Sequence, residues 1–356
     1  MNLLTRCGEN CTSVKANTSA RWIDSSLGVA CALVGRNSSN MKKLIGIPRL
    51  AYELVQIWCF NRKISIFGSV DVTNRCNLKC KHCYWWQNRE PQKELGSDDW
   101  RDVVRQNFIK KGVVSIALAG GEPLLRPDVI EAIIDEMGWR TVSIVTNGTL
   151  PLVDFGVGYF ISIDGTETVH DTIRGTPVYK MVKQNVIDHP EVDDVFINMT
   201  VNSLNYECVE DVVRDWYDYA RALTFQFHTP FSHHDRLWLP YGKLRDRTID
   251  KILQMKEDHP GFIINTSKQL NLFRDGKWTV NCPKWFFVNL DASGRTKQSC
   301  VISNTDENGT SPICERCGIG CNAGAYSGLV LSDAEWFRMW KVARRAVPFK
   351  NKLVSW

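Results

Sequence analysis

Short apolar segments rich in β-branched residues alternate with segments of helical periodicity along the middle of the chain. Segments of the first kind predict strands at 64–72, 113–120, 141–148, 159–165, 195–202 and 223–230. Apolar residues at helical spacing predict helices at 98–110, 128–137, 179–187 and 207–222. Strands that alternate with helices favour right-handed βαβ crossovers and a parallel sheet. The pattern therefore predicts an α/β protein with six strand–helix units.

The two ends of the chain have different patterns. Residues 1–40 are rich in Ser, Asn and Thr, and we expect a poorly ordered segment without the layout of a signal peptide. Residues 41–63 predict an amphipathic helix, with Met41 as an alternative start. Residues 326–356 predict a basic amphipathic helix. Such helices pack on their own domain, and a second interpretation places them on an anionic membrane surface.

Composition narrows the class of protein. The chain has 356 residues, of which 44% are hydrophobic and 23% charged, as in a soluble globular protein. Its net charge of +5 is too small to predict a nucleic-acid-binding groove. No apolar run has the length of a membrane-spanning helix. The 13 cysteines cluster at metal-ligand spacings, which indicates a reducing cytoplasm. The two amphipathic helices keep peripheral membrane contact as an alternative.

The most informative motif follows the first predicted strand. Cys76, Cys80 and Cys83 stand at C-x3-C-x2-C spacing in CNLKCKHC. Three thiolates at this spacing can bind three irons of a 4Fe–4S cluster. A fourth cysteine does not follow nearby, so one iron would keep an open coordination position for a cofactor or substrate. Zinc fits poorly, because zinc sites usually use four ligands in paired C-x2-C spacing.

CNLKCKHC resembles the cluster-binding loop of the radical S-adenosylmethionine (SAM) enzymes. The resemblance implies a partial (β/α)6 barrel, here at residues 64–235, and an open iron that SAM chelates. It also implies that an electron from the cluster cleaves SAM to methionine and a 5′-deoxyadenosyl radical. His82 occupies the position that packs near the adenine in that family. A SAM methyltransferase is excluded, since the usual Gly-rich loop is absent.

Further residues resemble the SAM contacts of the family. Gly120, Gly121, Glu122 and Pro123 match its GGEP motif, which binds the SAM amino group. The chemistry is reasonable, because glycine allows close backbone approach and a carboxylate accepts charge-assisted hydrogen bonds from an ammonium. The resemblance implies SAM contacts at the ends of later strands as well. These positions are Thr146, Asn147, Ser162, Asp164, Arg174 and Asn198, with Thr200 as an alternative to Asn198.

Two of these residues have a simpler interpretation. Asp164 would contact ribose hydroxyls or the SAM carboxylate region, but an aspartate before Gly165 is also typical of a turn. Arg174 resembles an arginine that grips the SAM carboxylate in relatives with a C-terminal cluster domain. Its alternative is a solvated charge at the start of a helix.

A second cysteine set follows a predicted helical connector at 236–281. Cys282 and Cys300 flank a hairpin with Gly294 at its turn, and CERCGIGC supplies Cys314, Cys317 and Cys321. Region 282–325 resembles the SPASM or twitch extension of radical SAM enzymes. The full SPASM pattern has seven cysteines, so five imply one auxiliary 4Fe–4S cluster held by four of them. A zinc site stays open as an alternative, since CxxC is common there.

These features predict a radical SAM enzyme that abstracts a hydrogen atom from its substrate. The expected substrate is a peptide or a small molecule. The sequence assigns no catalytic residue. A one-electron reductant such as ferredoxin or flavodoxin would be its partner. A lipid or membrane-associated substrate is one alternative, and a non-enzymatic metal-binding module is another. No other metal-binding residue stands at a suitable spacing from His228, His233 and His234 to suggest a metal site. We expect these three histidines to be loop residues or substrate contacts.

Overall fold

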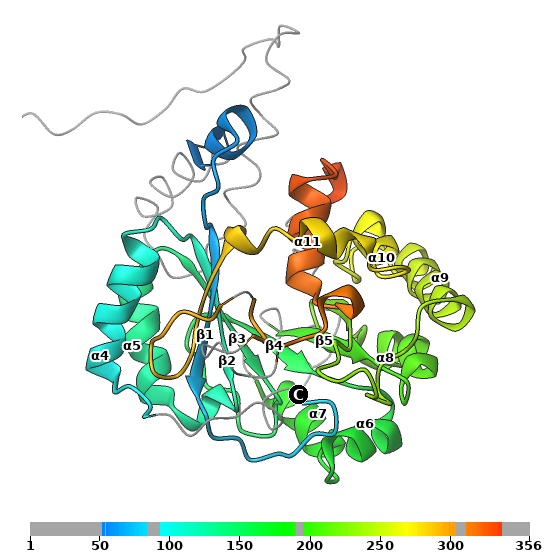
Figure 1. Cartoon of the computed structure of the whole chain (residues 1–356). Helices are drawn as coiled ribbons and strands as arrows, with labels where there is room; N and C mark the ends of the chain where they lie inside the picture. Colours follow the sequence, from blue (N-terminus) through cyan, green and yellow to red (C-terminus); the bar gives the residue numbers. More distant parts are fainter. Residues whose placement is uncertain are drawn as a thin grey trace, which may run out of the picture.

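A parallel sheet organises the computed structural model of the chain (Figure 1). The structure describes residues 52–53, 55–83, 93–189, 195–298, 300–303 and 311–336. Within them the sheet has seven strands in the order β6-β5-β4-β3-β2-β1-β7. Neighbouring strands are parallel throughout. The predicted segment at 1–40 and most of the predicted basic helix at 326–356 lie outside the described residues.

The bounds of the elements are as follows. The strands are β1 (Phe67–Thr73), β2 (Ser115–Gly120), β3 (Thr141–Thr146), β4 (Gly158–Ser162), β5 (Val195–Val201), β6 (Ala222–Phe227) and β7 (Phe287–Leu290). The main helices are α4 (Ser97–Val104), α5 (Pro127–Met137), α6 (Glu167–Arg174), α7 (Tyr179–Asp188), α8 (Val209–Trp216), α9 (Lys243–Asp258), α10 (Ser267–Leu272) and α11 (Gly320–Leu329). None of the helices in the described ranges is long and apolar enough to cross a membrane.

The predicted α/β class and partial barrel are confirmed. Strands β1 to β6 overlap the six predicted segments, and α4, α5, α7 and α8 overlap the four predicted helices. Helix α6 was missed, because its sequence ETVHDTIR is largely polar and short. The connection from β3 to β4, residues 147–157, has no helix, and Gly148, Pro151 and Gly156 interrupt helical periodicity there. Residues 52–53 and 55–60 are helical, as predicted.

The C-terminal extension is part of the same sheet. Strand β7 pairs with β1 in parallel, with Val70 opposite Leu290. The predicted hairpin after β7 is confirmed: the N–H of Asp291 donates to the carbonyl of Arg295 at 2.9 Å, and Gly294 has φ +79°. That positive φ is accessible to glycine without strain. The pairing of β7 with β1 was not predicted, because a four-residue strand gives little periodicity.

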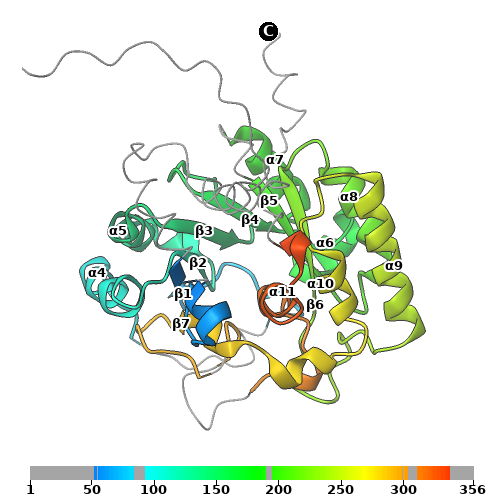
Figure 2. The ribbon, with the colours of Figure 1, turned by 90° about the horizontal axis from the view of Figure 1, so that it is seen from above.

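Helix α11 lies on the open side of the curved sheet, between β6 and the β1–β7 edge (Figures 1 and 2). At its start, the N–H of Gly320 donates to Gln226 Oε1 of β6 at 3.4 Å. Farther along, Ala325 packs in a cluster with Ile66 and Phe286, which precede β1 and β7. The helix therefore contacts both edges of the sheet and closes the space that a six-stranded barrel leaves open.

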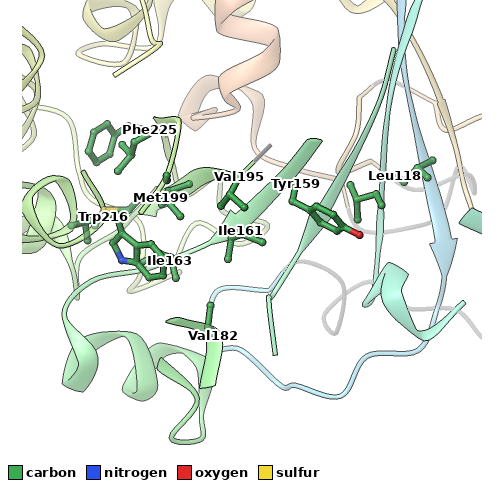
Figure 3. Packing of buried hydrophobic residues seen from close by; sticks show 14 of the residues in the cluster. Leu118, Tyr159, Ile161, Ile163, Val182, Val195, Met199, Trp216 and Phe225 are labelled. Carbon is green, nitrogen blue, oxygen red and sulfur yellow. The ribbon is translucent and has the colours of Figure 1, made fainter. Parts of the chain in front are cut away.

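The main core lies between the sheet and its outer helices. Tyr159 and Ile161 of β4, Val182 of α7 and Trp216 of α8 pack there, and all are fully buried (Figure 3). Full burial of such side chains stabilises the fold by about 1.5–3 kcal/mol each. The alternate residues of β4 and β5 are half-buried and include polar side chains. Because strand side chains alternate between faces, these polar residues line the inner face of the barrel.

A buried ion pair joins the extension to the barrel. Asp71 of β1 and Lys297, which follows the β7 hairpin, are both buried, and the Lys297 ammonium contacts the Asp71 carboxylate. Lys297 also donates to the carbonyl of Val301 at 2.6 Å. Burial raises the pKa of Asp71, and the nearby ammonium opposes that rise. Each charge therefore depends on the other to remain in the protein interior.

We expect Lys297→Met to lower the free energy of unfolding by about 3–5 kcal/mol, because it leaves the Asp71 carboxylate buried without its counter-ion. The double variant Asp71→Leu/Lys297→Met should lose much less, since it removes both charges together. Urea unfolding of the two variants and the wild type measures the difference. A single variant no less stable than the double variant would contradict this assignment.

Candidate functional site

The predicted site residues gather at the carboxyl ends of the parallel strands. The cysteine loop follows β1, the GGEP motif follows β2, Thr146 ends β3 and Ser162 ends β4. In a parallel sheet these ends share one edge, where ligands of α/β proteins bind. The structure therefore brings together motifs that are far apart in the sequence.

The first cysteine loop presents half-buried thiols that accept hydrogen bonds. Cys76 Sγ accepts from the N–H of Leu78 at 3.4 Å, and Cys80 Sγ accepts from Arg174 Nη1 at 3.7 Å. The N–H of Cys83 donates to the carbonyl of Cys80 at 3.2 Å, which fixes the turn between the last two cysteines. Burial raises the pKa of Cys76 and Cys80 as free thiols. A bound metal would reverse this, since coordination deprotonates a thiol.

Glu122 of the GGEP motif is a fully buried acceptor. Its Oε1 accepts from Thr146 Oγ1 at 2.6 Å and from the N–H of Leu124 at 3.1 Å, and its Oε2 accepts from the N–H of Asn147 at 2.8 Å. Burial raises the pKa of Glu122, and these donors oppose the rise. The side chain therefore joins the end of β2 to the end of β3.

The glycines of the motif allow the cysteine loop to approach. A Cβ on Gly121 would lie 2.1 Å from the carbonyl oxygen of Arg75, and one on Gly120 would lie 2.7 Å from that of Thr73. Gly120 also has φ +113°, which disfavours any other residue. Pro123 is buried and begins a 3-10 turn, Pro123–Leu125. In this structure the group that approaches the two glycines closely is the backbone at Thr73 and Arg75, just before the first cysteine.

Asn147 connects β3 to the cysteine loop. Its Nδ2 donates to Asn77 Oδ1 at 2.9 Å and lies 4.0 Å from Cys76 Sγ. Asn77 in turn donates to Thr149 Oγ1 at 2.7 Å. Thr146 is held by Glu122, as described above. Both residues of the predicted pair are therefore adjacent to the first cysteine loop and support its shape.

Arg174, Asp164 and His82 form a buried charged group beside Cys80. Arg174 Nη2 lies 2.7 Å from Asp164 Oδ2, and His82 Nε2 lies 3.7 Å from the same oxygen. Burial disfavours the Asp164 carboxylate, yet the charge and hydrogen bond of Arg174, together with the nearby His82 and His170, outweigh burial and keep the pKa of Asp164 low. Burial lowers the pKa of His82 to about 4, so its imidazole is neutral. Within the described residues, His82 Nδ1 and Arg174 Nε are buried without hydrogen-bond partners.

Ser162, Asn198 and Thr200 occupy the inner face of the barrel. Ser162 and Asn198 are opposite each other in the β4–β5 register, and both are half-buried. The Ser162 carbonyl accepts from Arg174 Nη2 at 3.1 Å. Thr200 Oγ1 accepts from Gln226 Nε2 at 3.0 Å. Asn198 is thus nearer the charged group, whereas Thr200 contacts β6.

The five C-terminal cysteines form a second gathered set. Cys300 is their common neighbour, because its charge acts on Cys282, Cys317 and Cys321. Burial raises the pKa of Cys282 to about 11 and that of Cys317 to about 12 as free thiols. Cys314 is exposed, and its charge acts on Cys282. The structure thus brings all five predicted residues into one region.

Hydrogen-bond donors accompany this second set. Asn322 Nδ2 donates to Cys282 Sγ at 3.4 Å, and the N–H of Ile319 donates to Cys317 Sγ at 3.5 Å. Donors of this kind stabilise thiolates in iron–sulfur sites. In the part of the chain that the structure covers, no three His, Cys, Asp or Glu side chains converge on one point as around a single metal ion.

Comparison with known proteins identifies the domain. Residues 70–223 match the family model of the Radical SAM superfamily. Residues 70–223 form a radical SAM domain. The matched region includes the first cysteine loop, the GGEP motif and the strand ends up to β6.

Radical SAM relatives include proteins of different activities. The sporulation killing factor maturation protein SkfB of Bacillus subtilis is 31% identical over 46% of this chain and 45% of SkfB. A probable GTP 3′,8-cyclase of Methanopyrus kandleri is 41% identical over 24% of this chain and 27% of the cyclase. Another, of Methanothermobacter marburgensis, is 29% identical over 41% of this chain and 52% of its own length. The chain therefore matches about a quarter to a half of the length of these relatives.

Solved radical SAM structures share the fold. Streptococcus suis SuiB bound to its precursor peptide SuiA has a TM-score of 0.53 at 14% identity, covering 78% of this chain and 69% of SuiB. Native anSMEcpe with bound AdoMet and a peptide has a TM-score of 0.53 at 15% identity, covering 80% of this chain and 84% of anSMEcpe. At this identity the likeness concerns the fold alone.

The residues of the first site fit the two groups that the radical SAM family binds. Three thiols on one short loop, two of which accept N–H hydrogen bonds, suit a cluster with one open iron. The partnerless nitrogens of His82 and Arg174 suit a polar ligand next to the last two cysteines. Contact of SAM with the GGEP residues, Asp164 or Asn198 stays a prediction. In the protein alone, Asp164 and Arg174 pair with each other rather than facing solvent.

The sequence predicted His228 as a loop residue or substrate contact, but it did not predict two other polar residues near the sites, Asp235 and Arg245. His228 follows β6, and its Nε2 lies 2.8 Å from Asp235 Oδ2. The charge of His228 lowers the pKa of His82. His228 and Asp235 therefore lie on the side of the barrel that carries the first cysteine loop. The HHD motif drew attention to this segment, but nothing in it singled out Asp235. Arg245 of α9, which lies fully buried, was also missed.

We expect Glu122→Gln to lower the free energy of unfolding by about 1–3 kcal/mol. The substitution replaces one carboxylate oxygen, which accepts hydrogen bonds, by an amide NH2 group, which cannot accept them from the neighbouring donors. The exposed Glu131 on α5 provides the control, since Glu131→Gln should change stability by less than about 0.5 kcal/mol. Chemical denaturation of both variants measures the effect. Equal stability of the two variants would show that the buried acceptor is dispensable.

Proposed function

We propose that the chain cleaves SAM reductively at Cys76, Cys80 and Cys83 and abstracts a hydrogen atom from a peptide substrate. The observation that carries the proposal is the placement of this C-x3-C-x2-C loop at the end of β1, against Glu122, Asn147 and Arg174. Strand ends of a parallel barrel are the usual site of catalysis. A one-electron reductant such as ferredoxin or flavodoxin would serve as partner.

Cys76, Cys80 and Cys83 would hold a 4Fe–4S cluster, which would supply the electron for the reductive cleavage of SAM. The residues of the chain hold and orient these groups. Asn147 and Arg174 donate toward Cys76 and Cys80, and the neutral His82 offers its Nδ1 beside the third cysteine. The apolar, fully buried side chains behind the strands keep the loop fixed and exclude water from that side.

We further propose that four of Cys282, Cys300, Cys314, Cys317 and Cys321 bind an auxiliary 4Fe–4S cluster. The grouping of these thiols around Cys300 and the N–H donors to Cys282 and Cys317 support it. A cluster held by four cysteines has no open iron for SAM, so it would accept or pass on electrons.

A peptide is the preferred substrate class. Among the relatives, SkfB is by its name a maturation protein of a sporulation killing factor, and it aligns over nearly half of this chain. The cyclase of Methanopyrus kandleri is more identical but aligns over only 24% of the chain. Neighbours of the same fold have been solved with peptides bound. These likenesses support a peptide as the substrate class without specifying the sequence of that peptide.

Iron and sulfide content tests the two clusters. Anaerobically reconstituted wild type should hold about eight irons, and the triple variant Cys76→Ala/Cys80→Ala/Cys83→Ala about four. Only the wild type should form 5′-deoxyadenosine from SAM under reduction. Cys59→Ala is the matched control, because this exposed cysteine belongs to neither set. A wild type that binds about eight irons without forming 5′-deoxyadenosine would contradict the enzymatic proposal, and about four irons, all lost in the triple variant, would contradict the auxiliary cluster.

GTP tests the substrate class. Reduced enzyme incubated with SAM and GTP should leave GTP intact, because we propose a peptide substrate. Chromatography of the nucleotides after the incubation measures this. A new nucleotide product that requires both SAM and Cys83 would assign the chain to cyclase-like chemistry instead.

A further inference from the structure

Arg245 is a buried cation with few partners. It lies on α9, its side chain is fully buried, and its Nη1 donates to the carbonyl of Leu239 at 2.8 Å. Its Nε and Nη2 have no hydrogen-bond partner among the residues that the structure describes. A buried guanidinium that leaves donors unpaired is unfavourable unless a nearby negative charge compensates it. Arg245 therefore requires an anionic group nearby.

Two aromatic rings place Arg245 against the C-terminal cysteines. The guanidinium carbon lies 4.4 Å from the ring centroid of Phe227 and 4.7 Å from that of Tyr241. The N–H of Phe227 donates to the carbonyl of Gly318 at 2.9 Å, and the Tyr241 hydroxyl donates to that of Glu315 at 2.7 Å. Both rings thus contact the segment that carries Cys314 and Cys317.

No carboxylate in the described ranges forms an ion pair with Arg245. Its neighbour Asp246 instead lies 3.4 Å from Arg274 Nη1. The groups whose charges act on Arg245 are Tyr241, Cys317 and Asp246. Burial lowers the pKa of Arg245 to about 10, so the side chain remains a cation at neutral pH. Cys317 is the cysteine of the second set whose charge acts on Arg245, and it lies between Glu315 and Gly318, which the two aromatic rings contact.

We propose that Arg245 is the counter-charge of the cluster bound by the C-terminal cysteines and makes that cluster easier to reduce. The inference rests on the proposed auxiliary cluster. Reduction adds one electron and no proton, so the cluster gains one negative charge. A fixed cation in an apolar environment interacts with that extra charge more strongly than the same cation would in water. Surrounding charge is one of the factors that set iron–sulfur reduction potentials.

The experiment is a potentiometric titration with dithionite, monitored by electron paramagnetic resonance of the reduced cluster. The background is the triple variant Cys76→Ala/Cys80→Ala/Cys83→Ala, so that only the auxiliary cluster contributes. Arg245→Gln should lower the ratio of reduced to oxidised cluster about tenfold at a fixed potential, which is about 59 mV for one electron. Arg245→Lys keeps the charge and should stay near the parent. Arg274→Gln is the control, because that arginine has carboxylate partners.

The outcomes separate this inference from the function it rests on. A parent without cluster iron would contradict the auxiliary cluster itself. A cluster whose potential is the same with Arg245→Gln as in the parent would overturn the role of Arg245. Loss of the cluster in Arg245→Gln but not in Arg245→Lys would support the counter-charge. Equal loss in both would overturn it, because the effect would then depend on side-chain shape rather than charge.

Discussion

The buried carboxylate of Glu122 is the constraint on which the arrangement of the first site depends. It accepts hydrogen bonds from Thr146, from the Asn147 backbone and from Leu124, so the ends of β2 and β3 cannot move independently. Asn147 then holds the cysteine loop through Asn77. The N–H of Glu122 donates to the carbonyl of Arg75 at 2.8 Å, which closes the connection from the other side. One buried acceptor thereby links three strand ends through short, well-paired contacts.

The C-terminal extension is connected to the barrel at both of its edges. At one edge, β7 pairs with β1 and Lys297 contacts Asp71. At the other, Gly318 and Gly320 hydrogen-bond to Phe227 and Gln226 of β6. Helix α11 runs from the contact with β6 back to the edge formed by β1 and β7. The same sheet therefore holds both cysteine sets. Neither set can be displaced without disturbing strand pairing or a buried charge.

Sequence patterns predicted those features of the structure that depend on residues close together in the chain. Strands β1 to β6 and the turn at Gly294 follow from hydrophobic periodicity and from a glycine that tolerates positive φ. The two cysteine sets were found by spacing, and the structure gathers their members. Asp71 with Lys297 and Arg245 with Phe227 and Tyr241 were not predictable, because each is defined by a partner distant in the sequence. Helix α6 was missed since the residues it buries include His170 and Arg174, which give no apolar stripe.

Each cysteine set has a buried arginine, but the two surroundings differ in charge. Beside the first set, Arg174 is neutralised by Asp164, and the buried Glu122 adds a further negative charge that acts on Cys76. Beside the second set, Arg245 has no carboxylate ion-pair partner in the described ranges, and Lys284 adds a positive charge that acts on Cys282. Since more positive surroundings favour the reduced form of an iron–sulfur cluster, the same ligand chemistry would give two different potentials. Electrons would then pass more readily toward the second set than away from it, which is the direction required to oxidise a substrate radical formed at the first.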